Sequence, residues 1–113
     1  MELVELAFFT DDVNEMAAFY RNLLGVEPVA SSNGMAIFMV GGTKIFIHQT
    51  YVPATGDLPP ENHMAFKVSD VDAACAELVK AGLEIETPPA NYSWGRSAYL
   101  RDPDRHMIEI TEG

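Results

Sequence analysis

The sequence predicts an α+β protein in which a β-α-β-β-β unit occurs twice. The chain has 113 residues, which suits one compact domain, with hydrophobic residues at 48% and charged residues at 21%. The two observations behind the prediction are a repeated order of expected elements and a repeated residue pattern. When the chain is shifted by 58 positions, five of fourteen residues between positions 5 and 18 match identically. About one match is expected by chance, so the repeat is firm.

The first module is expected over residues 1–50. The first ten residues alternate along the chain, which is typical of a half-buried strand. Asp11 and Asp12 form a cap, with Glu15 at capping-box spacing, and apolar residues at helical intervals follow as far as Gly25. Three more strands are expected, at 26–30, 35–40 and 43–50, with a turn at 31–34 and a hairpin turn at 41–42.

The second module is expected over residues 63–113, after a linker at 51–62 that is rich in proline and has no periodicity. A strand at 63–68 precedes a capping box that runs from Ser69 to Asp72, and the helix that follows ends at Gly82. The remaining strands are expected at 83–86, 97–101 and 107–111, with a break at Pro88-Pro89 and a turn at 102–105.

The charge balance excludes several classes of partner. Seventeen acidic and seven basic side chains give a net charge of −10, which argues against binding to nucleic acid or to an anionic membrane. No apolar run reaches 18 residues, the first residues lack the basic region of a signal peptide, and Cys75 is the only cysteine. We therefore expect a cytoplasmic protein with a small-molecule or protein partner.

The repeat also selects candidate metal ligands. The shift of 58 places Glu5 on His63, and a shift of 61 places His48 on Glu109. Each of the four has apolar neighbours in an expected strand, so alternation turns all four away from the helices. Two imidazoles and two carboxylates suit Zn, Ni, Mn, Fe or Co, and an octahedral ion would keep positions for substrate. The alternative is that each is a structural histidine or a solvated glutamate.

Few other residues are candidates for binding or catalysis. The polar and aromatic stretch 91–96, which contains Trp94 and Arg96, is either surface loop or the mouth of a binding cavity. Cys75 lies on the apolar stripe of a helix and is expected in the core, and His106 is expected to be structural. The chain has no Gly-rich phosphate loop and no Cys-x-x-Cys motif.

Three segments carry a family resemblance. Asp-Asp-Val and Phe-Tyr-Arg-Asn-Leu-Leu-Gly (11–25), His-Met-Ala-Phe-Lys-Val-Ser-Asp-Val-Asp (63–72) and Arg-Asp-Pro-Asp-Arg-His-Met-Ile-Glu (101–109) resemble the vicinal oxygen chelate superfamily, which contains glyoxalases, bleomycin-resistance proteins and extradiol dioxygenases. The resemblance covers nearly the whole chain and implies one glyoxalase-like domain over 1–113. It also implies paired modules that form a cup-shaped, incomplete barrel around a divalent metal held by Glu5, His48, His63 and Glu109. Small members usually form homodimers.

Local similarity to fosfomycin-resistance enzymes adds further residues. It implies that Ser97 and Tyr99 contact the substrate, and it makes Glu109 and Tyr99 the candidate catalytic residues. Two departures stand out: Glu5 occupies a position where the family usually has histidine, and Arg105 occupies the usual glycine of the turn.

Three functions remain open at this point. The first is a metal-dependent lyase, isomerase, transferase or dioxygenase that acts on a small oxygen-rich substrate. The second is a metal-free antibiotic-binding protein, and the third is a scaffold or regulator whose site has decayed. For the first function we expect substrate-binding residues at these positions: Phe9, Phe46, Trp94, Arg96, Ser97 and Tyr99. For the second we expect an apolar cleft lined by these residues: Phe9, Phe38, Phe46, Trp94 and Tyr99.

Overall fold

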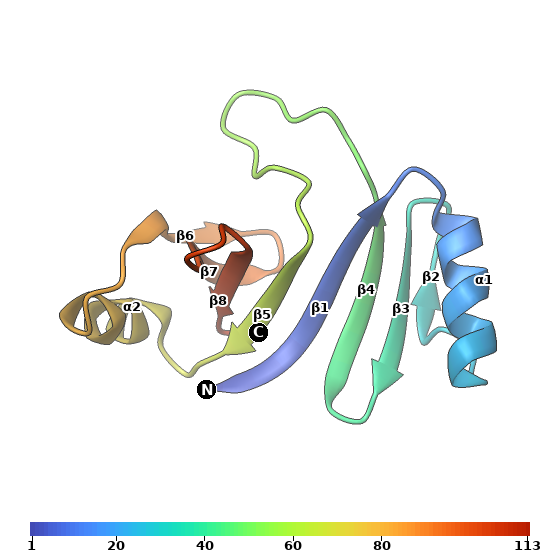
Figure 1. Ribbon diagram of the computed structural model, residues 1–113, viewed down its shortest axis with the longest axis horizontal. Helices are drawn as coiled ribbons and strands as arrows, with labels where there is room; N and C mark the ends of the chain where they lie inside the picture. The colour runs from blue at the N-terminus through green and yellow to red at the C-terminus, as the bar shows by residue number, and fades with distance from the viewer. The chain divides into compact units, whose positions relative to one another are not determined.

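The computed structural model describes all residues from 1 to 113 and divides them into two compact units. The N-terminal unit comprises residues 5–62, and the C-terminal unit comprises residues 1–4 and 63–113. Each unit contains a β-sheet and one helix, and the element order along the chain is β-α-β-β-β twice (Figure 1). The predicted fold class is therefore confirmed.

The sheet of the N-terminal unit has the strand order β2-β3-β4-β1. Its strands are β1 (Glu2–Thr10, which begins in the other unit), β2 (Ala30–Ser31), β3 (Met35–Val40) and β4 (Thr43–Gln49). β1 and β4 are parallel, whereas β3 is antiparallel to both β2 and β4. Helix α1 (Val13–Leu24) contacts β3 and β4.

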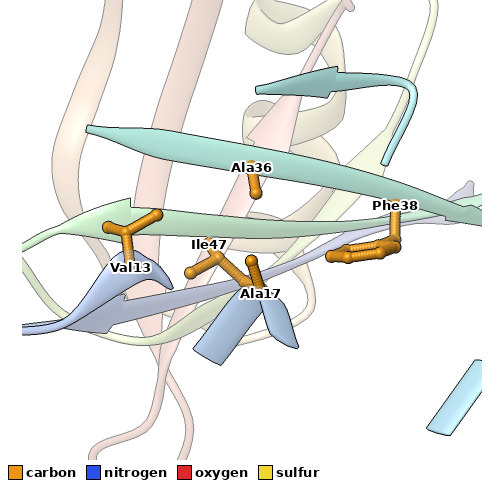
Figure 2. Packing of buried hydrophobic residues seen from close by; sticks show 5 residues of the cluster. All are labelled: Val13, Ala17, Ala36, Phe38 and Ile47. Carbon is orange, nitrogen blue, oxygen red and sulfur yellow. The ribbon is translucent and has the colours of Figure 1, made fainter. Parts of the chain in front are cut away.

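The core of this unit lies between α1 and the sheet. Figure 2 shows Val13 and Ala17 of α1 beside Ala36, Phe38 and Ile47 of the strands. Phe38 and Ile47 are fully buried. The expectation that Phe38 lines a binding cleft was therefore wrong, because its ring packs in the core beneath α1. The apolar stripe of α1 and one face of the sheet thus exclude water together, which is the main source of stability for such a pair of layers.

The C-terminal unit repeats this arrangement with the strand order β5-β8-β7-β6. Its strands are β5 (His63–Lys67), β6 (Ile85–Tyr92), β7 (Gly95–Arg101) and β8 (Met107–Thr111), and its helix is α2 (Val71–Lys80). β5 and β8 are parallel, and β7 is antiparallel to β8 and β6. The buried core contains Cys75, as predicted, with these other members: Val71, Ala98, Leu100 and Ile110.

Helix caps follow the sequence signals with one difference. Asp12 caps α1 by accepting a hydrogen bond from the Glu15 backbone N–H, and Gly25 ends the helix in the left-handed conformation. The cap of α2 is Asp70 and not Ser69, because the Asp70 carboxylate accepts the hydrogen bond from the Ala73 N–H.

Two strands differ from the prediction. The strand expected at 26–30 is reduced to two residues, and Pro28 in the segment before it has no N–H for a ladder. β6 continues through Pro88 and Pro89 to Tyr92, where a break was predicted. β6 is an edge strand with irregular register, and an edge tolerates proline because one side of the strand needs no donor. Neither helix is long and apolar enough to cross a membrane.

Candidate functional site

Glu109 lies in β8, between β5 and β7. It is in register with Tyr99, and Ser97 lies two residues earlier on the same face of β7. The adjacent Ile108 and Ile110 pack on the opposite face, in the core with α2. Strand alternation therefore presents Glu109, Tyr99 and Ser97 together on the face of the sheet away from the helix.

The two carboxylate oxygens of Glu109 have different partners. Oε1 lies 3.1 Å from Nε2 of His63, which is at the start of β5. Oε2 accepts one hydrogen bond from the Ser97 hydroxyl at 2.8 Å and another from the Trp94 indole N–H at 3.2 Å. Glu109 is 4% exposed, so these groups replace water around the carboxylate.

The surroundings of Glu109 favour its ionised form. Burial by itself would raise the pKa of Glu109, but hydrogen bonds from His63 and Ser97 and the charge of His63 outweigh burial and lower it. The Tyr99 side chain also hydrogen-bonds to this carboxylate. Burial, followed by the nearby Glu109 charge, raises the pKa of Tyr92. An ionised carboxylate oxygen beside an imidazole nitrogen is a pair of donors that a divalent transition metal accepts.

Aromatic rings surround this group. Tyr92 and Trp94 are stacked, with ring centroids 4.7 Å apart and planes 2° from parallel. Tyr99 meets Tyr92 edge-on at 6.1 Å and His63 edge-on at 6.2 Å. These contacts limit the freedom of the His63 and Trp94 side chains, which both contact Glu109.

Arg96 does not join this group. Its guanidinium forms two bonds to the Asp72 carboxylate, of 2.6 and 2.9 Å, and a third of 3.0 Å to the side chain of Asn91. Asp72 lies in the first turn of α2, so Arg96 is directed to the helix side of the sheet. Strand alternation explains this, because Arg96 directly precedes Ser97 and has the opposite orientation.

In the N-terminal unit, the register of the strands corrects one equivalence of the repeat. Ala65 of β5 is in register with Glu109, whereas Ala7, its repeat partner in β1, is in register with Phe46. Phe46 therefore matches Glu109 in this unit, and the equivalence between His48 and Glu109 was wrong by two residues. A shift of 61 aligned the residue types of the two last strands, but hydrogen-bond register depends on the neighbouring strand and cannot be obtained from a shift.

Glu5 is two residues before Ala7, as His63 is two residues before Ala65. The Glu5 carboxylate lies 3.8 Å from the ammonium of Lys44, its register partner in β4.

His48 belongs to an aromatic cluster within the N-terminal unit. Its ring centroid lies 5.5 Å from that of Phe9, 5.6 Å from that of Phe46 and 6.4 Å from that of Tyr51. Its Nδ1 is 2.6 Å from the Gln49 carbonyl oxygen. The predicted contact residues Phe9 and Phe46 thus surround His48, whereas Trp94, Ser97 and Tyr99 surround Glu109.

Two site residues were missed in the sequence. Tyr92 was placed in the stretch 91–96 without a role of its own, and Tyr51 was placed in the expected linker. Tyr92 ends β6 and Trp94 lies in the two-residue turn that follows, so strand alternation does not relate the two rings. Tyr51 has no periodic signal.

The family model for the glyoxalase/bleomycin resistance protein/dioxygenase superfamily matches residues 2–110. The chain belongs to this superfamily. Within it, the chain is similar to the metallothiol transferase FosB of Shouchella clausii, with 26% identity over 96% of this chain and 77% of the relative. It is also similar to the fosfomycin resistance protein FosX of Listeria monocytogenes, with 27% identity over 98% of this chain and 89% of the relative.

Solved structures agree on the fold. A superfamily member from Vibrio splendidus superposes with a TM-score of 0.70 at 14% identity, covering 96% of both chains. At this identity the likeness concerns the fold alone. The family resemblance drawn from the three motifs is therefore confirmed by the family model and by the fold.

Proposed function

We propose that this superfamily member is a divalent-metal-dependent enzyme that acts on a small oxygen-rich substrate. The observation that supports this most directly is the buried Glu109 carboxylate with one oxygen 3.1 Å from a histidine nitrogen. Burying a carboxylate is costly unless a cation or several donors compensate it. The donor pair suits Zn, Ni, Mn, Fe or Co, and affinity order alone does not select among them.

The residues divide into ligands and supports. His63 Nε2 and Glu109 Oε1 are the proposed ligands, and Glu5 is a third because it repeats the position of His63. We do not include His48, because the strand register does not match it to Glu109 and its Nδ1 is next to the Gln49 carbonyl. A bound ion would act as a Lewis acid on the substrate oxygens.

The other groups on this face would contact the substrate. The Tyr99 hydroxyl hydrogen-bonds to Glu109 and is suited to hold or move a proton at a substrate oxygen. The stacked rings of Tyr92 and Trp94 offer apolar surface beside the ligands. Arg96 is excluded from this role by its ion pair with Asp72.

The names of the relatives favour one reaction class. A metallothiol transferase and a fosfomycin resistance protein suggest transfer of a thiol to a small antibiotic of the fosfomycin type. Glu5 adds a negative charge in place of the usual histidine, which disfavours a phosphonate anion compared with a neutral substrate. Fosfomycin and a neutral epoxide should therefore be assayed in parallel with glutathione or cysteine and each metal, with product detected by NMR.

Metal binding provides the decisive test. Purified metal-free protein is incubated with each ion, and bound metal and melting temperature are measured. We expect about one equivalent bound and a raised melting temperature, since a ligand at 100 times its Kd stabilises by about 2.7 kcal/mol. The variants Glu109→Gln and His63→Gln should lose both effects. His106→Gln is the matched control, because His106 is exposed and pairs with Asp102 in a turn.

Less than about 0.1 equivalent bound for every ion, with unchanged melting temperatures, would rule out the metal-dependent enzyme. Such a result would favour the second candidate.

The second candidate is a metal-free protein that binds a cationic antibiotic. It is supported by the aromatic cluster of Phe9, Phe46, His48 and Tyr51 in the N-terminal unit and by the net charge of −10. Here a cationic glycopeptide such as bleomycin should raise the melting temperature in the presence of a chelator. Phe46→Ala should remove that shift.

Two further expectations belong to this proposal. Because small members of the superfamily usually form homodimers, we expect a homodimer here. Light scattering coupled to size-exclusion chromatography tests this expectation. A cytoplasmic location, expected from the single cysteine, can be tested by cell fractionation.

A further inference from the structure

The only tryptophan of the chain has an unusual position. Trp94 is 50% exposed, so burial of apolar surface does not by itself explain its placement. Its indole N–H, however, lies 3.2 Å from Oε2 of Glu109 and 3.1 Å from the Ser97 hydroxyl oxygen. The polar edge of the ring is thus directed to the most buried carboxylate of the C-terminal unit.

We propose that Trp94 is a positioning residue that, together with Ser97, holds Oε2 of Glu109 and leaves Oε1 for the metal. This inference rests on the proposed function, since it assigns Trp94 a role toward the metal ligand Glu109. Trp94 does not contact the metal in this proposal; it acts through the carboxylate.

The hairpin between β6 and β7 is built to hold the indole in this position. Tyr92 and Gly95 are register partners at its end, and Gly95 has φ of 135°, a conformation open to glycine and strained for other residues. The chain therefore reverses directly after Trp94. The parallel stack with Tyr92, 4.7 Å between centroids, then fixes the plane of the indole.

The two oxygens of the Glu109 carboxylate have different hydrogen-bond donors. Two neutral donors, the Trp94 N–H and the Ser97 O–H, bind Oε2, and the His63 imidazole faces Oε1. A carboxylate with one oxygen held in this way offers the other in a fixed direction. Mutation of a residue that hydrogen-bonds to a metal ligand and orients it typically lowers metal affinity by 10- to 100-fold.

The test compares the metal affinity of three variants by calorimetry. Trp94→Phe keeps the ring and its stack on Tyr92 but lacks the N–H donor, and Ser97→Ala removes the second donor. Ser93→Ala is the matched control, because Ser93 is exposed in the same hairpin and the change keeps both donors to Oε2. We expect Trp94→Phe and Ser97→Ala each to weaken metal binding by about 10-fold. Ser93→Ala should bind metal like the wild type, and the absorption spectrum of bound Co²⁺ should change only in the first two variants.

A second measurement does not depend on how the Trp94 variant folds. Since the chain has one tryptophan, its ¹H–¹⁵N spectrum contains one indole N–H signal. In the wild type this signal should exchange slowly with solvent, and it should shift both on addition of Zn²⁺ and in Glu109→Gln.

The possible outcomes separate the two proposals. If the wild type binds no metal, the metal-dependent function and the role of Trp94 both fail. If the wild type binds metal but Trp94→Phe binds it equally well, with the same Co²⁺ spectrum, only the role of Trp94 fails. An indole signal that does not respond to metal or to Glu109→Gln also overturns that role.

Discussion

The Ser97 hydroxyl donates a 2.8 Å hydrogen bond to Oε2 of Glu109, and this bond joins two residues that are 0% and 4% exposed. Water has almost no access to either group. The buried carboxylate therefore depends on its protein donors for solvation, and loss of one donor leaves the charge under-solvated.

The first prediction concerns this bond. Ser97→Ala should lower the free energy of unfolding by about 1–3 kcal/mol, the usual cost of leaving a buried polar group short of a partner. Urea unfolding at neutral pH measures the change. Ser93→Ala, at an exposed position of the β6–β7 hairpin, serves as the control and should have little effect. Equal stability of the two variants would show that the bond contributes little.

The second prediction concerns Arg96, which was expected from the sequence to bind substrate. Because its guanidinium pairs with Asp72 on the helix side, Arg96→Ala should lower the melting temperature slightly and leave metal and ligand affinity unchanged. Thermal unfolding and calorimetry measure the two effects. A large loss of ligand affinity with an intact melting temperature would instead restore the substrate-binding role.

The third prediction concerns the turn that contains Arg105. Arg105 has φ of 74° and is the one residue other than glycine with a positive φ. Side chains are strained in this conformation, so Arg105→Gly should raise the free energy of unfolding by about 0.5–1 kcal/mol. The 3.4 Å pair between Arg105 and Glu86 is exposed and offsets little of this gain.

Arg105→Ala is the control for the third prediction. It loses the same ion pair but keeps a Cβ, so chemical denaturation should show it to be less stable than Arg105→Gly. The reverse order would mean that the side chain, and not the backbone, decides the stability of this turn.

The fourth prediction concerns the pH dependence of the same turn. The His106 backbone N–H donates to the Asp102 carboxylate at 2.8 Å, and the His106 ring donates a second bond, which together lower the pKa of Asp102 despite some desolvation. A lowered folded-state pKa means that the stabilisation is present above the unfolded-state pKa. It is lost as the pH falls through the lower, folded-state pKa.

Urea unfolding across the acid range tests this sign. Asp102→Asn should be less stable than the wild type at neutral pH, and the difference should shrink as the pH falls. Asp104→Asn removes the same charge from the same turn and is the control. A difference between wild type and Asp102→Asn that stays constant with pH would contradict the assigned cause.

Much of the fold could be predicted because it depends on local patterns. Strand alternation, helical spacing and turn residues located both helices and most strands, and the repeat showed that they form two similar units. The strand predictions were wrong where the pairing between strands decides the structure. β6 passes through Pro88 and Pro89 because it is an edge strand, and the sequence does not reveal which strand lies at an edge.

The candidate site could be predicted only in part for the same reason. Residue type and repeat position selected His63 and Glu109, which lie 3.1 Å apart in the structure. The same argument misplaced His48, because a one-dimensional shift contains no information about ladder register. Arg96 was grouped with Ser97 and Tyr99 by proximity in the chain, although alternation places it on the other face.

The sequence by itself determined the superfamily motifs, the two modules, the acidic surface and the residue types that can bind a metal. These features follow from composition and from interactions between residues close in the chain. Only the tertiary structure decided which oxygen of Glu109 faces His63 and which is held by Ser97 and Trp94. The physical reason is that these bonds join residues on three strands and a hairpin, whose register is set by backbone hydrogen bonds across the sheet.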